Sequence, residues 1–279
     1  MESSKDFSAA TTARFPAALQ AGSATTTTIL AYGALLSEAS SRLTFPHLTN
    51  FRYVRIRGYR RVFAQPHLFL LQQGLIGRPG DTTLRLASLS AEPCPKKPES
   101  SFVVAAFDVQ LDDEQRAAFV QREASYDIVA VPYFPLEPLR PVKVEKEKEE
   151  EEHPAPDGMG VICLASADDR QPPQVLAQLA KDHANLAFPG TIWHWPHDSG
   201  LLPANIYLRH CLLAVEKAAD ASVDSLVVEG ARVARDSFWH DTYLADRTTT
   251  LAEYLSDSTI YQEVMESRPP PHLATRFGG

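Results

Sequence analysis

Short β-branched and apolar runs, separated by glycine, proline and polar breaks, dominate the first 165 residues. The first run covers residues 25–31 and consists of threonine, isoleucine, leucine and alanine, a composition that predicts a half-buried strand. It ends in Tyr32-Gly33-Ala34-Leu35, where the glycine predicts a tight turn. Such a turn presents successive backbone N–H groups and can hold a carboxylate or an oxyanion. An ordinary strand-to-loop turn is the alternative, and the tetrapeptide alone favours that alternative.

Several further segments follow the pattern of strands. Residues 51–64 are a second strand candidate. Apolar and basic residues alternate in 54–57, which indicates a strand with one solvated face, and Gly58 predicts a bulge or a corner where the sheet curls. The other strand-like segments are 67–76, 84–90, 102–109, 128–131, 141–144 and 160–165. We therefore expect residues 25–165 to form one mixed, curled sheet or barrel.

Helical patterns are concentrated in the second half of the chain. One earlier helix is predicted at 112–122, because Asp112 and Asp113 complement the partial positive charge of a helix N-terminus. Beyond Pro172, apolar residues recur at helical spacing and prolines fall at first turns, so this part is expected to be mainly helical. Residues 250–253 have the pattern of a capping box and predict a last short helix.

Shifts in composition indicate how the chain is divided. Residues 1–24 are rich in serine, threonine and alanine without periodicity, and are expected to be a disordered tail. A barrel domain is expected over 25–165, with 145–157 as an acidic exposed loop inside it. A helical extension packed on the barrel is expected over 166–265. The proline-rich end, 266–279, is expected to be a second tail.

Charge and cysteine content narrow the class of partner. The formal net charge of −8 argues against nucleic-acid binding, and no apolar run approaches the length that spans a bilayer, so neither partner is expected. Three cysteines suit a reducing compartment better than a disulfide framework. Lys5 and Arg14 in the N-terminal segment resemble an organelle transit peptide, but Glu2 and Asp6 count against one. We expect a cytoplasmic protein.

Three motifs, taken in order, resemble the gamma-glutamylcyclotransferase superfamily, including its ChaC-type members. They are Tyr32–Leu35 after a strand, the sequence Gly-Tyr-Arg-Arg-Val-Phe at 58–63, and Arg122-Glu123 after a helix. The resemblance covers residues 28–165. It implies an α+β fold built on a small mixed β-barrel of the gamma-glutamylcyclotransferase-like type. The later residues would form a C-terminal helical extension longer than the few helices that this family usually adds.

The resemblance also implies a reaction and a site. The family releases 5-oxoproline from small γ-glutamyl compounds, so a small-molecule γ-glutamyl substrate is implied, with no cofactor and no metal. Glu123 matches the family's single acid/base residue. The positions that match substrate-binding residues are Tyr32, Gly33, Ala34, Leu35 and Tyr126. Ala34 replaces the family's serine, which removes a hydroxyl but keeps the backbone N–H groups.

The chemistry of cyclisation explains why one carboxylate is enough. The substrate's own α-amine attacks its γ-carbonyl and closes a five-membered lactam. At neutral pH this amine is an ammonium, so a base must remove a proton, and the leaving amine must then receive one. A single glutamate beside both nitrogens can do both, an effect worth roughly 10²–10⁴-fold in rate. Without the resemblance, Glu123 would be interpreted as a solvated glutamate at the end of a surface helix.

A binding module is the main alternative to an enzyme. A cyclotransferase-like barrel that is catalytically silent would use its helical half to hold a partner. Ala34 and the long extension favour this interpretation, whereas Glu123 opposes it.

A metal-dependent hydrolase is a further alternative. Pro196 makes helical facing of the histidines on either side of it unfavourable, and the chain has no His-Glu-x-x-His motif. We therefore expect packed or surface histidines in place of a metal site. The residues considered for such a site are His194, His197, His210, His240 and Asp241.

Overall fold

The computed structural model describes residues 26–78, 80–136, 155–167, 191–220 and 225–278, together with residues 177, 180, 181 and 184. The predicted N-terminal tail lies outside the described residues. The same holds for the strand predicted at 141–144, for most of the acidic loop, and for most of the helix predicted directly after Pro172.

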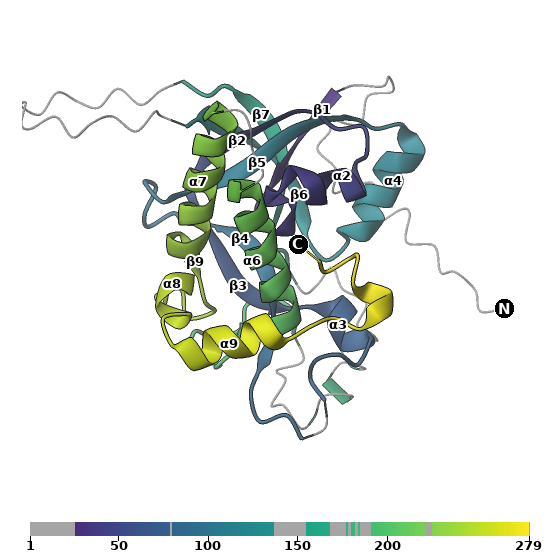
Figure 1. Ribbon diagram of the computed structural model, residues 1–279, viewed down its shortest axis with the longest axis vertical. Helices are drawn as coiled ribbons and strands as arrows, with labels where there is room; N and C mark the ends of the chain where they lie inside the picture. Colours follow the sequence, from purple (N-terminus) through teal and green to yellow (C-terminus); the bar gives the residue numbers. More distant parts are fainter. Residues whose placement is uncertain are drawn as a thin grey trace, which may run out of the picture.

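Five strands close into a barrel in the order β1-β5-β2-β6-β7 (Figure 1). Their bounds are Thr26–Ala31 for β1, Thr49–Arg57 for β2, Ser101–Gln110 for β5, Asp127–Pro135 for β6 and Gly158–Leu164 for β7. The β1–β7 pair is parallel and the other pairs are antiparallel. The prediction of an α+β fold with a small mixed β-barrel is confirmed.

A second sheet, with the strand order β8-β4-β3-β9, lies beside the barrel. It contains β3 (Tyr59–Pro66), β4 (Arg85–Pro93), β8 (Leu202–Pro203) and β9 (Thr242–Tyr243). Gly58 has a φ of +77°, a conformation that favours glycine, and it turns the chain from the barrel strand β2 into β3. The predicted corner at this glycine is confirmed. The prediction of one continuous sheet is wrong, because the corner divides the strands between two sheets.

The strand predicted at 67–76 is wrong, since this segment contains the helix α3 (Leu68–Gln72). The His67 side chain accepts a hydrogen bond from the Leu70 N–H at 3.4 Å and so caps the helix. Leu70 and Leu71 are buried. A short apolar run has no clear period, and in this case the cap and the burial favour a helix.

The helix predicted after Asp112 is confirmed as α4 (Asp113–Arg122). Its capping box is complete, because Asp112 accepts from the Gln115 N–H at 2.8 Å and the Gln115 side chain accepts from the Asp112 N–H at 3.1 Å. Two shorter helical segments precede it, η2 (Ala34–Leu36) and α2 (Glu38–Thr44).

Long helices from the second half of the chain cover both sheets. In Figure 1, α6 (Asn205–Asp220) and α7 (Ser225–His240) run side by side across the strands. Helix α6 packs against α7 and η2, while α7 packs against β5 and β2 of the barrel. The capping box predicted at Thr250 and Glu253 is confirmed at the start of α8 (Leu251–Tyr254), which is followed by α9 (Ser258–Glu266).

The C-terminal segment packs as part of the core, which corrects the prediction of a tail after Glu266. A short 3-10 turn, η5 (Pro271–Leu273), follows the prolines, and both Leu273 and Phe277 are buried. The Phe277 ring lies 5.4 Å from the His210 ring of α6, measured between centroids. Proline prevents a long helix in this segment, but its two apolar side chains still find partners on α3 and α6.

Within the described residues, the structure contains no helix that is both long enough and apolar enough to cross a bilayer.

The packing of the C-terminal segment can be tested by substitution. Phe277 is 3% exposed, so Phe277→Ala should lower the free energy of unfolding by about 3–5 kcal/mol in a urea titration. Tyr261→Ala serves as a matched control on α9, because Tyr261 is 40% exposed and should change stability by less than about 0.5 kcal/mol. Equal stability of the two variants would contradict the packing described.

Candidate functional site

Residues 32–35, the β1–η2 loop, turn sharply away from the end of β1. The Leu36 N–H donates to the Gly33 carbonyl at 2.9 Å, which closes the turn. The Leu36 carbonyl in turn accepts from the Tyr53 hydroxyl of β2 at 2.9 Å. The loop is therefore fastened to the barrel wall. The Leu35 side chain packs against a separate apolar cluster that contains residues of β1 and α4.

A fully buried arginine holds the first residue of this loop. Arg61 of β3 donates from Nη1 to the carbonyls of Tyr32 and Val103, at 3.3 Å each. Its Nη2 donates to the Ser237 carbonyl and its Nε to the Thr242 hydroxyl, both at 2.7 Å. Burial lowers the pKa of Arg61 to about 9, so the guanidinium still carries its charge at neutral pH. The cation also lies over two rings, 5.1 Å from the centroid of Phe102 and 4.8 Å from that of Phe238.

Glu123 ends α4 and points its carboxylate into a largely enclosed environment. Its backbone N–H donates to the Phe119 carbonyl at 3.0 Å, and its side chain is 19% exposed. Burial raises the pKa of Glu123 above the ordinary value of 4.5, while the nearby cations Arg122 and Arg276 oppose the rise. Arg122 Nε lies 3.1 Å from Glu123 Oε1. Glu123 is thus a carboxylate whose basicity is higher than that of an exposed glutamate.

Two tyrosines predicted as binding residues lie within the electrostatic reach of Glu123. The Tyr32 hydroxyl donates to the Cys163 carbonyl at 2.7 Å, and the Tyr126 hydroxyl donates to the Leu89 carbonyl at 2.8 Å. Burial raises the pKa of both phenols, and the Glu123 charge raises them further. Both hydroxyls therefore remain protonated at neutral pH and act as hydrogen-bond donors.

Helix α6 adds two residues that the sequence did not single out. A Cβ atom added at Gly33 would lie 3.0 Å from the Tyr207 hydroxyl and 3.8 Å from Cys211 Sγ. Burial raises the pKa of the Cys211 thiol to about 12, while the Tyr207 hydroxyl and the Ala34 N–H oppose the rise. Tyr207 and Cys211 are four residues apart, so they share one face of α6. This four-residue spacing was the signal in the sequence that could have identified the two residues as a pair.

These residues form one connected cluster. The Ser88 hydroxyl of β4 lowers the pKa of both Tyr126 and Tyr207 against the larger effect of burial, which links the surroundings of Glu123 to Gly33. The structure therefore brings Tyr32, Gly33, the backbone of Ala34, Tyr126 and Glu123 together, whereas the side chain of Leu35 lies in the other cluster. A basic carboxylate among protonated donors can transfer protons to and from a substrate amine.

The histidines are dispersed. Among the described residues no group of three or more histidine, cysteine and acidic side chains could hold a metal ion. His210 packs against Phe277, and burial lowers its pKa to about 4. His194 and His197 are exposed.

No family model matches the sequence, and no curated protein matches it. Three solved structures resemble the chain. One is a gamma-glutamyl cyclotransferase with 10% sequence identity and a TM-score of 0.34. The match covers 57% of this chain and 80% of the cyclotransferase chain. An uncharacterized protein from Homo sapiens has 13% identity and a TM-score of 0.32, with the same two coverages.

The third is a yeast gamma-glutamyl cyclotransferase specific to glutathione, at 13% identity and a TM-score of 0.37. The match covers 75% of this chain and 97% of the yeast chain. Two of the three structures thus carry the name of the family that the sequence motifs resemble.

The contact between Gly33 and Tyr207 predicts a compensating pair of substitutions. Gly33→Ala should destabilise the protein by about 1–3 kcal/mol, because the new methyl group would press on the Tyr207 hydroxyl 3.0 Å away. Tyr207→Phe removes that oxygen and should recover part of the loss in the double variant. A double-mutant cycle from denaturant unfolding measures the coupling, and additive losses would contradict the contact.

Proposed function

We propose that this protein is a gamma-glutamylcyclotransferase-like enzyme that releases 5-oxoproline from a small γ-glutamyl compound, with Glu123 as its acid/base. One observation supports the proposal above the others. Glu123 is largely enclosed, burial raises its pKa, and its charge acts on the phenols of Tyr32 and Tyr126. A raised pKa makes this carboxylate a better base for an ammonium at neutral pH.

The reaction needs proton transfer at two nitrogens. The Glu123 carboxylate takes a proton from the α-ammonium, and the freed amine forms a bond to the γ-carbonyl carbon. The attacking nitrogen loses a second proton as the lactam forms, and the bond from the γ-carbon to the leaving nitrogen breaks. The leaving nitrogen takes up both protons, at least one of them through Glu123, and departs as an ammonium. No water, oxidant or reductant is consumed. The enclosure of Glu123 strengthens its interaction with the ammonium.

The oxyanion that forms at the γ-carbonyl requires fixed donors. The backbone N–H groups of residues 33–35 are the candidates, because the phenol proton of Tyr126 is already donated to the Leu89 carbonyl. The N–H of Ala34 meets the sulfur of Cys211. In the proposed reaction, the substrate oxygen takes the place of this sulfur as the acceptor of the Ala34 N–H.

The interaction of the Ala34 N–H with the Cys211 sulfur also supports a second candidate function. If Cys211 keeps the Ala34 N–H occupied, the loop lacks a donor for the oxyanion, and the protein is a catalytically silent cyclotransferase-like module that binds a partner. The two candidates differ in one observable, the release of 5-oxoproline from γ-glutamyl dipeptides, γ-glutamylamines or glutathione.

Glu123→Gln keeps the shape of the side chain and removes the base. It should lower kcat for 5-oxoproline release by about 10²-fold or more, while substrate binding measured by calorimetry changes little. Ala34→Ser is the matched control, because it restores the hydroxyl of the family and should keep activity. Turnover by Glu123→Gln at the rate of the wild type would exclude Glu123 as the base.

The pH dependence of kcat/KM tests the charge of Glu123 directly. The base must be ionised, so kcat/KM should fall as the pH decreases through a pKa above 4.5. Arg122→Gln removes a cation that lowers this pKa, and should therefore move the acid limb to higher pH. Arg116→Gln is the control on the same helix, since Arg116 pairs with Asp113 at 3.0 Å. An acid limb that stays in place in Arg122→Gln would contradict the assignment.

A further inference from the structure

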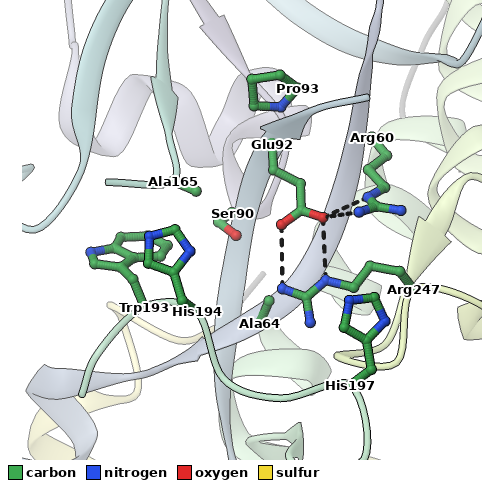
Figure 2. Close-up of a pocket in the computed structure, with 10 residues that line it drawn as sticks. All are labelled: Arg60, Ala64, Ser90, Glu92, Pro93, Ala165, Trp193, His194, His197 and Arg247. Carbon is green, nitrogen blue, oxygen red and sulfur yellow. Dashed lines mark hydrogen bonds and ion pairs between the residues drawn. The ribbon is translucent and has the colours of Figure 1, made fainter. Parts of the chain in front are cut away.

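A cavity of about 350 Å³ lies between the second sheet and the segment 193–197 (Figure 2). Its volume falls within the range of small-molecule binding pockets. Trp193 forms an apolar part of the wall, and most of the remaining lining is polar or charged. Glu123 does not line this cavity, so an inference about it is independent of the reaction proposed above.

The cavity has two guanidinium groups that share one carboxylate, as Figure 2 shows. Arg60 places Nε and Nη2 at 2.5 Å from Glu92 Oε1. Arg247 places Nε at 3.2 Å from the same oxygen and Nη2 at 3.4 Å from Glu92 Oε2. Among the described residues, the charged groups that line the cavity therefore carry one positive charge in excess.

This excess charge is poorly exposed to water. The side chains of Arg247 and Glu92 are 8% and 15% exposed. A partly desolvated cation attracts an anion more strongly than one on an open surface does. The hydrogen bonds that Arg247 makes to other described residues also leave N–H groups on its guanidinium for a ligand. The cavity thus has both a charge and donors that an oxyanion can use.

Backbone strain is concentrated at the same place. Among the described residues, three that are not glycine have a positive φ, and two of them line this cavity: His194 at 59° and Arg247 at 58°. Residues other than glycine rarely adopt a positive φ, and such residues are found more often at functional sites than elsewhere. The backbone conformation sets the direction in which the side chains of His194 and Arg247 leave the chain.

His197 is oriented toward the cavity by a hydrogen bond behind it. Its Nδ1 lies 3.0 Å from the Asp246 carbonyl oxygen. A carbonyl oxygen can only accept, so Nδ1 carries the proton and donates. This bond leaves Nε2 without a partner among the described residues, and available to a ligand. The arrangement is the one by which proteins commonly orient a functional imidazole.

A neighbouring cavity has a different arrangement of charge. It shares Arg60 and Arg247, and its other lining residues include Lys97 and the carboxylates of Glu99 and Asp241. These two carboxylates compete with an anion for the cations of that cavity. The side formed by Trp193, His194 and His197 has no carboxylate other than Glu92 among the described residues that line it.

We propose that the cavity is a binding site for a small molecule that presents a carboxylate or phosphate group. Arg60 and Arg247 hold the oxyanion, His197 contacts it through Nε2, and Trp193 packs against the rest of the molecule. The two guanidinium groups are shared between the ligand and Glu92. The strength of binding is therefore set by competition between two acceptors.

Calorimetric titration of the full chain with inorganic phosphate and with succinate, in separate arms at low and constant ionic strength, tests the site. The wild type should bind at least one probe saturably. Arg60→Gln and His197→Gln should each weaken binding about tenfold, as expected for the loss of a charge-assisted hydrogen bond. Glu92→Gln removes the competing acceptor and should tighten binding several-fold, which a merely structural ion-pair network would not do.

The control is Arg52→Gln, since Arg52 pairs with Asp108 at 3.5 Å on the barrel and should not affect binding. Stronger binding of one probe identifies the group, and either probe supports the site. The proposal is overturned if neither probe binds saturably. It is also overturned if Arg52→Gln weakens binding as much as Arg60→Gln, which would indicate unspecific attraction. His197 is exposed, so His197→Gln should fold normally. If circular dichroism shows that Arg60→Gln does not fold, the affinity of His197→Gln for the probes tests the site.

Discussion

The fold depends on the buried guanidinium of Arg61, which has no carboxylate among its hydrogen-bond partners. Its acceptors lie at the end of β1, on β5, on α7 and on β9. An unsatisfied cation in the interior costs several kcal/mol, so the charge of Arg61 is tolerated only when these elements are in place. The barrel, the second sheet and the helices of the second half are therefore required to assemble around one side chain.

Because of this constraint, the C-terminal half is an integral part of the fold. Residues after 166 are not an addition to a finished barrel, because they contribute β8 and β9 to the second sheet. They also supply Tyr207 and Cys211 to the β1–η2 loop. Arg276, near the chain's end, acts on the charge of Glu123. The candidate site and the helical half thus form one unit.

Local patterns were enough to predict much of the fold and part of the site. The barrel strands, the α4 helix with its acidic start, the Gly58 corner and the turn at Gly33 each follow from a few neighbouring residues. Long-range contacts produced what was missed. The two-residue strands are too short to show a hydrophobic period. Helix α3 depends on a cap and a buried face. Phe277 and Cys211 acquire their roles only from partners far along the chain.

The most direct test of the proposed chemistry is to incubate the protein with γ-glutamyl peptides in water enriched in ¹⁸O and to analyse the products by mass spectrometry. Intramolecular attack by the α-amine consumes no water. The account therefore predicts 5-oxoproline without ¹⁸O, together with the free amine. Glutamate that carries ¹⁸O would show hydrolysis in place of cyclisation, and the absence of any product would leave the silent binding module. Either of these results would contradict the account.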